Sequence, residues 1–266
     1  MTTHQSPPSA TRDSVEPLLS LHGIGKKFGA VQALSGIDLE IFPREIVAIV
    51  GDNGAGKSTI VNILAGVYGP DAGNIRFGGK KVSIGSPSAS RALGIATVYQ
   101  DLALCDNLDI VANMWLGQEL GSVAIKEIEM EKRSWDLLRQ LSAVVPSVRI
   151  PVASLSGGQR QTVAIARSLI GEPTVVILDE PTAALGVVQT AEVLGLIKRL
   201  RDRGHGVILI SHNMVDVQAV ADRIVVLRLG RNNGSFRAAD VTLQSIIAAI
   251  TGATDNAAKP PQGTPQ

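Results

Sequence analysis

The chain has 266 residues, of which 45% are hydrophobic and only 3% aromatic, and its formal net charge at pH 7 is +1. This length allows one large or two modest domains, and the weak charge and few aromatic residues argue against a nucleic-acid partner. No apolar run approaches the roughly 20 residues needed to span a bilayer, so we expect a soluble protein. The single cysteine, Cys105, excludes an intramolecular disulfide and is expected to be a small buried residue.

Two polar segments flank the predicted folded body. Residues 1–17 lack the order of basic and apolar residues that marks a signal peptide, and residues 252–266 end in KPPQGTPQ. Both compositions are typical of disordered tails. We therefore expect a single folded domain over residues 18–251.

Within this body, short apolar stretches alternate with longer segments of helical spacing. Strands are predicted in residues 18–49, 94–99, 174–178 and 206–210, with hairpins over 73–84, turning at Gly78-Gly79, and over 224–237, turning at 232–234. Helices are predicted in residues 60–65, 101–154, 158–170 and 188–203. Because several strands are apolar on both faces and alternate with helices, the predicted fold class is α/β, with a mainly parallel sheet covered by helices on both faces.

A glycine-rich loop joins the apolar run at 45–50 to the first of these helices. Its sequence GDNGAGKST fits the pattern G-x-x-x-x-G-K-[ST] and comprises Gly51, Asp52, Asn53, Gly54, Ala55, Gly56, Lys57, Ser58 and Thr59. The glycines let successive amides point into one concavity at the positive end of the helix dipole, which suits phosphate. We expect Lys57 to reach the outer phosphates, Ser58 to bind a magnesium ion and Thr59 to contact the inner phosphates. The alternative is a turn that only caps a core helix.

A second candidate site follows the apolar strand at 174–178. Its carboxyl end carries Asp179 and Glu180, and ligands bind at that end of the strands in open α/β sheets. We expect Asp179 to bind the magnesium ion and Glu180 to accept a proton from the attacking water. The alternative is an ordinary acidic turn, but the phosphate loop favours the active role.

The segment LSGGQ at 155–159 places Ser156, Gly157, Gly158 and Gln159 at the start of another predicted helix. This is a second helix terminus suited to an anion, and one nucleotide does not obviously need two such termini from one molecule. A head-to-tail dimer resolves this, because each nucleotide then lies between the phosphate loop of one copy and the Ser156 helix of the other. The competing interpretation is that Ser156 is an ordinary N-cap.

The order of these motifs resembles that of the ABC-transporter ATPases over residues 18 to about 237. The resemblance rests on GDNGAGKST, on Gln100 after a strand, on LSGGQ, on VVILDE at 175–180 and on His212 after the strand at 207–210. It implies a P-loop NTPase fold of ABC-ATPase type, with an antiparallel β subdomain and a helical subdomain at about 101–154. It also implies hydrolysis of ATP with Mg²⁺.

The resemblance assigns roles to three more residues. Gln100 would touch the magnesium ion and the attacking water, and His212 would hydrogen-bond the γ-phosphate and steady Glu180. Phe28 stands where the family has an aromatic residue that stacks on adenine, although an ordinary core or edge phenylalanine is the alternative.

The strings AGVYGPDAGNI, VYQDLALCDNLDI and EPTAALG are similar to those of monosaccharide importers of the fructose or ribose type, without identifying the sugar. The implied partners are a second ATPase subunit, identical or not, two transmembrane permease subunits and an external sugar-binding protein, at the cytoplasmic face of the membrane. The apolar patches 102–104 and 111–116 are either a permease-docking surface or subdomain core.

Two features depart from this branch. Many of its ATPases are fused tandem copies, whereas this chain has one set of motifs, and Gly186 stands where the family usually has Asp. Two alternatives to the importer remain. A soluble ABC protein of DNA repair or translation usually has long coiled-coil insertions, tandem copies or basic arms, and this sequence has none of them. A regulatory ATP-binding module without turnover is disfavoured by Glu180 and His212.

Overall fold

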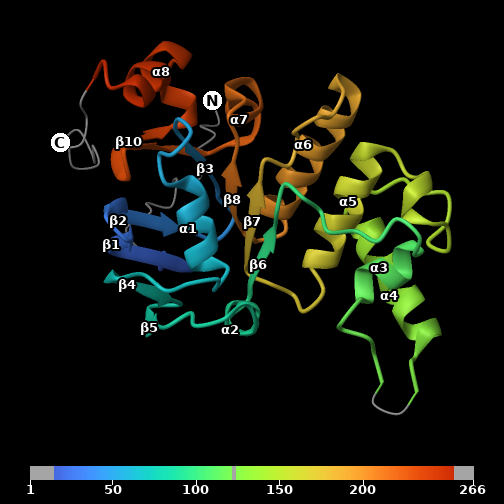
Figure 1. The fold of residues 1–266 in the computed structure, drawn as a ribbon. Coiled ribbons are helices and arrows are strands. Elements are labelled where there is room, and N and C mark those ends of the chain that lie inside the picture. The colour runs from blue at the N-terminus through green and yellow to red at the C-terminus, as the bar shows by residue number, and fades with distance from the viewer. Residues whose placement is uncertain (1–14, 122–123, 255–266) are drawn as a thin grey trace, which may run out of the picture.

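The structure is a computed structural model that describes residues 15–121 and 124–254, and its strands form two sheets (Figure 1). One sheet has six strands in the order β10-β9-β3-β8-β7-β6, and the other has four in the order β2-β1-β4-β5. Residues 1–14 and 255–266, most of the two predicted tails, lie outside the described residues. Within the described ranges, no helix is both long and apolar enough to cross a membrane.

The six-stranded sheet forms the centre of the molecule. It consists of β3 (Ile46–Val50), β6 (Ile95–Val98), β7 (Val175–Asp179), β8 (Gly206–Ile210), β9 (Arg223–Arg228) and β10 (Arg231–Arg237). Neighbouring strands from β6 to β9 pair in parallel, and β10 joins β9 as an antiparallel edge. The predicted parallel α/β core is therefore confirmed.

The alternation of side chains along these strands gives each face of the sheet its own cover of helices. In β7, Val175 and Ile177 pack with α1 (Lys57–Leu64), whereas Val176 and Leu178 pack with α5 (Gly157–Ser168) and α6 (Val187–Asp202). Strand β8 divides in the same way. The helix after the phosphate loop and the helix after LSGGQ consequently lie on opposite faces of the sheet, as Figure 1 shows.

The four-stranded antiparallel sheet packs against α1, on the face away from α5. Its strands are β1 (Leu19–Phe28), β2 (Val31–Ile41), β4 (Ala72–Phe77) and β5 (Lys80–Val82). The β4–β5 hairpin turns at Gly78 and Gly79, both with positive φ (52° and 69°), as the sequence predicts. Buried leucines and isoleucines of β1 and β2 share one core with α1 and β3.

The second predicted hairpin turns at a different place. Strands β9 and β10 are joined by Leu229 and Gly230, whose φ angles of 47° and 73° suit a two-residue turn. The predicted turn at 232–234 lies inside β10, where the pairing register shifts. Asn232 is held there by β2, because its side chain accepts a hydrogen bond from Asp38 N–H and donates one to Asp38 O.

Further helices complete the fold. The segment 101–154 contains α3 (Ile110–Trp115), α4 (Glu127–Gln140) and the 3₁₀ turn η2 (Val152–Ser154). The sequence did not predict α2 (Pro87–Ala92), α7 (Met214–Val220), η3 (Ala238–Asp240) and α8 (Leu243–Thr251). Helices α2 and α7 and the turn η3 span fewer than eight residues, which is too short for a helical spacing of apolar residues to be recognised. Helix α8 follows the hairpin that was predicted to close the body.

The helical subdomain shares its core with α5 and one face of the central sheet. Trp115 is buried, and its indole N–H donates to Met130 O at 3.1 Å and to Ser134 Oγ at 3.0 Å. Most of the apolar patch at 111–116 is therefore core, and Leu116 alone is exposed there, at 49%. Cys105 is half-buried rather than fully buried as expected.

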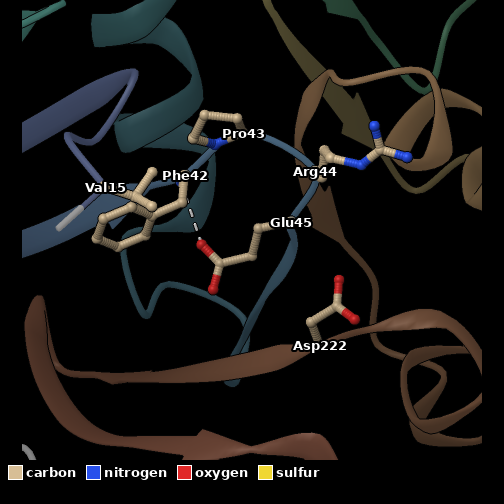
Figure 2. A pocket seen from close by; sticks show the side chains of 6 residues that line it. All are labelled: Val15, Phe42, Pro43, Arg44, Glu45 and Asp222. Carbon is tan, nitrogen blue, oxygen red and sulfur yellow. Dashed lines mark hydrogen bonds between the residues drawn. The ribbon is translucent and has the colours of Figure 1, made fainter. Parts of the chain in front are cut away.

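A small hollow lies at the amino end of β3, away from the phosphate loop (Figure 2). It has a volume of about 230 Å³ and is lined by Val15, Phe42, Pro43, Arg44, Glu45 and Asp222. Glu45 accepts hydrogen bonds from the Phe42 N–H and from Arg223, and Asp222 accepts one from the Ile46 N–H at 2.8 Å. These charges fasten the strand ends, and none of the predicted site residues lines the hollow.

The buried contacts of the helical subdomain can be tested by replacing leucine side chains with alanine. Leu138 is fully buried, so Leu138→Ala should lower the free energy of unfolding by about 2–5 kcal/mol through lost contacts and a residual cavity. The control Leu116→Ala, at a half-exposed position, should cost about 0.5 kcal/mol or less. Urea unfolding measures both, and equal losses would contradict this packing.

Candidate functional site

At two positions of the phosphate loop, the backbone conformation and the space around it accept only glycine. A Cβ on Gly51 would lie 2.3 Å from Leu227 O, and one on Gly56 would lie 2.5 Å from Leu34 Cδ2. Their φ angles of 152° and 106° are also unusual for other residues. The glycines therefore set the path of the loop against neighbouring strands, and the loop leads directly into α1.

The loop leaves polar groups open to solvent at the start of α1. Asp52, Asn53, Gly54 and Ser58 are exposed, and no side chain among the described residues caps the first amides of α1. The Lys57 ammonium crosses the loop and donates to Gly51 O at 2.6 Å and to Asp52 O at 3.0 Å. Free amides at a helix N-terminus beside a lysine form a cradle that fits an anion.

The acidic pair lies at the carboxyl end of β7. Burial and the neighbouring Glu180 carboxylate raise the pKa of Asp179, whereas the Lys57 ammonium opposes this shift. Lys57, at the start of α1, and Asp179, at the end of β7, are therefore close enough for their charges to interact. Glu180 has a positive φ of 50° and keeps only 14% of its side chain exposed.

The parallel register brings His212 to this acidic pair. Asp179 pairs with Ile210, so the residues that follow each strand leave the sheet side by side. His212 Nδ1 lies 2.8 Å from Glu180 Oε2, and the His212 backbone N–H donates to the same oxygen at 3.4 Å. His212 remains 74% exposed, so the ring can contact a ligand while it holds Glu180.

Gln100 lies at the same edge of the sheet. Val98 of β6 pairs with Leu178 of β7, so Gln100 follows its strand at the level at which Glu180 follows β7. Tyr99 lies between Val98 and Gln100 in the chain. Burial raises the pKa of Tyr99, and the Asp179 carboxylate raises it further. Tyr99 was not predicted as a site residue, because the sequence marks it only as the last residue of a predicted strand.

Phe28 ends β1 and is 46% exposed. Its ring meets the Tyr68 ring edge-on, with centroids 5.2 Å apart and an angle of 82° between planes. The Lys26 ammonium lies 5.6 Å from the Phe28 centroid and is anchored to Asp71 at 2.9 Å. Phe28 is thus an edge residue with open ring surface rather than a core residue.

Residues 156–159 build the start of α5. Ser156 Oγ accepts from the Gln159 N–H, and Gln159 Oε1 accepts from the Ser156 N–H at 3.0 Å, which is a capping box. A Cβ on Gly157 would lie 3.0 Å from Leu185 Cδ2, and one on Gly158 would lie 3.1 Å from Gln189 Cβ. The two glycines permit close packing on the start of α6. Ser156 is an N-cap, and any role towards a nucleotide is additional.

Comparison with known proteins decides the family. The family described as ABC transporter matches residues 34–183, more than half of the chain. The xylose/arabinose import ATP-binding protein XylG of Sulfolobus acidocaldarius is 45% identical over 80% of this chain and 86% of its own. The chain belongs to the ABC transporter family. As a member, it has the fold and motifs of the ATPase component of such a transporter.

Two further relatives support this membership of the ABC transporter family. The fructose import ATP-binding protein FrcA of Rhizobium meliloti is 43% identical over 90% of this chain and 96% of its own. A solved dimeric, post-hydrolysis structure of the ATP-binding cassette MJ0796, bound to ADP and Pi, matches with a TM-score of 0.70 and 27% identity. That match covers 83% of this chain and 98% of the cassette.

One structural link at the site of this ABC ATPase was not predicted. Thr182 follows Glu180 by two residues, and its hydroxyl donates to Asp216 Oδ2 at 2.7 Å. Asp216 is 5% exposed and lies in α7, the helix that follows His212. The hydrogen bond therefore fastens the two segments that carry Glu180 and His212 together.

This link can be tested with isosteric variants. Thr182→Val removes the donor but keeps the shape, so the buried Asp216 carboxylate loses its partner and the free energy of unfolding should fall by about 1–3 kcal/mol. Thr182→Ser keeps the hydroxyl and should stay close to the parent. Chemical denaturation of both variants measures this difference, and an equal effect of Val and Ser would refute the role of the hydroxyl.

Proposed function

We propose that this chain is the ATP-hydrolysing subunit of an importer for a monosaccharide and that it works as a head-to-tail dimer. The observation that carries this proposal is that the chain has two helix starts suited to an anion and that the two helices pack on opposite faces of one sheet. The phosphate loop precedes α1, and Ser156 precedes α5. We infer from this that one nucleotide does not take both helix starts from the same copy of the chain.

The dimer supplies what a single copy lacks. In a head-to-tail arrangement, the loop at 51–59 of one copy and residues 156–159 of the other hold the same triphosphate between them. ATP then closes the dimer by bridging two surfaces, and hydrolysis removes the bridge. The dimeric form of the MJ0796 cassette is consistent with this arrangement.

The residues at the carboxyl edge of the sheet are suited to the hydrolysis step. Lys57 would contact the outer phosphates, and Glu180 would accept the proton of the attacking water. His212, 2.8 Å from Glu180, would orient that carboxylate and contact the γ-phosphate. Gln100 would contact the attacking water, and the exposed ring of Phe28 would stack on adenine.

The same edge fits a magnesium ion. Ser58, Asp179 and Gln100 offer hydroxyl, carboxylate and amide oxygens, which are the ligands that Mg²⁺ prefers. The described residues include no group of three His, Cys, Asp or Glu side chains that could hold a metal ion. A site with few protein ligands suits Mg²⁺, which usually keeps waters and binds phosphate oxygens. The ion would neutralise charge on the phosphates.

The transport role rests on the relatives. XylG and FrcA are named for the import of different monosaccharides, so we propose this substrate class and not one sugar. The chain would lie at the cytoplasmic face of the membrane, beneath two permease subunits that receive the sugar from an external sugar-binding protein. The second ATPase subunit would be a second copy of this chain or a paired ATPase subunit.

Replacement of the proposed base tests the reaction. Glu180→Gln keeps the size of the side chain but cannot accept the proton, so ATP hydrolysis should fall by about 100-fold or more while ATP still binds. Because the bridging triphosphate then persists, the variant should accumulate as a dimer in ATP. Phosphate release and size-exclusion chromatography with ATP measure the two effects.

A matched carboxylate provides the control. Glu172 is exposed and precedes the opposite end of β7, so Glu172→Gln should hydrolyse ATP at the parent rate. If Glu180→Gln also kept the parent rate, Glu180 would not be the base. A variant that lost ATP binding together with hydrolysis would point instead to a role in binding.

A further inference from the structure

Arg167 joins the last turn of α5 to the segment that follows Gln100. Its Nη2 donates to Leu102 O at 2.6 Å, and its Nη1 donates to Ala103 O at 2.9 Å. The helix that carries Arg167 begins at the Ser156 cap, and its 12 residues span about 18 Å. Helix α5 and the Arg167 side chain together therefore link Ser156 to residues 100–103, called here the Gln100 segment.

Arg167 makes this contact with a charged group that is partly removed from water, which costs free energy. Burial lowers the pKa of Arg167, and no carboxylate among the described residues forms an ion pair with it. The half-buried guanidinium is committed to two main-chain carbonyls, and hydrogen bonds from a charged donor are stronger than those from a neutral one. This arrangement fixes the position of the chain rather than balancing charge.

The backbone that Arg167 holds is itself constrained. Ala103 has a positive φ of 47°, which is uncommon for a residue other than glycine. Its N–H donates to Asp101 Oδ1 at 3.1 Å, while its carbonyl accepts from Arg167. The bend after Gln100 is thus held from both sides, so a displacement of α5 moves this segment with it.

We propose that Arg167 is a positioning residue that couples the two nucleotide sites of the dimer. The inference rests on the proposed function, in which Gln100 acts on the nucleotide of its own chain and Ser156 acts on that of its partner. When ATP draws Ser156 and α5 towards the partner, Arg167 carries the Gln100 segment along. Each site then reaches its full activity only when the other is engaged, which makes hydrolysis cooperative in ATP.

The same helix provides a matched control. Arg160 lies seven residues before Arg167, two turns along the same face of α5. It forms an ion pair with Asp106 at 3.1 Å and donates to Ala153 O, so it also fastens a neighbouring segment to α5. It does not touch residues 100–103, and the inference gives it no part in coupling.

The test compares Arg167→Met, Arg167→Lys and Arg160→Met in the full-length chain. ATP hydrolysis is measured against ATP concentration, with urea unfolding in parallel. Arg167→Met should lower the Hill coefficient from between one and two towards one and kcat by about tenfold. Because two charged hydrogen bonds are lost, its free energy of unfolding should also fall, and the urea curve verifies that the variant is folded under the assay conditions. Arg167→Lys reaches one carbonyl and should recover part of both, whereas Arg160→Met should keep the parent values.

Hydrogen exchange of residues 99–106 provides an independent reading. In a Glu180→Gln background, added ATP should change the exchange of this segment, and Arg167→Met should abolish that response. The inference is overturned if Arg167→Met keeps the parent Hill coefficient and exchange response, or if the parent itself shows a Hill coefficient of one. A parent that hydrolyses no ATP would overturn the proposed function, and this inference with it.

Discussion

The central constraint is the burial of both faces of the parallel sheet. Side chains alternate along β7 and β8, so each strand contributes to one core with α1 and to another with α5 and α6. This burial fixes the two helices, and with them the phosphate loop and Ser156 at their starts, on opposite faces of the sheet. The proposal that a second subunit completes each nucleotide site starts from this packing of the sheet.

The parallel register has an equally direct consequence at the carboxyl edge. Pairing of Asp179 with Ile210 brings Glu180 and His212 within 2.8 Å, and the bond between Thr182 and Asp216 holds their segments together. Arg167 then ties the Gln100 segment to α5. The segments that carry the residues proposed for hydrolysis are therefore held by side-chain contacts to other segments of the chain.

Much of this could be predicted from the sequence because it depends on local patterns. The strand, the glycine loop and Lys57 are contiguous, and buried strands are visible as apolar runs, so the parallel sheet and the two helix starts were both predictable. The β9–β10 turn was placed wrongly because the signal at 232–234 serves a shifted register tied to Asp38. Long-range links such as those of Thr182 and Arg167 have no sequence pattern, since their partners are main-chain or side-chain atoms distant in the chain.

Complementation between two inactive variants tests the shared site most directly. Lys57→Ala removes the phosphate-loop lysine, and Ser156→Arg obstructs the other surface, so each variant alone should be inactive. In a mixture, a heterodimer regains one site with an intact lysine and an intact Ser156, so the rate should rise above that of either variant alone. Without coupling between the two sites it would reach about a quarter of the parent rate, and with coupling it stays below that. If the mixture were no more active than the separate variants, both groups would act within one chain, and the head-to-tail site would be contradicted.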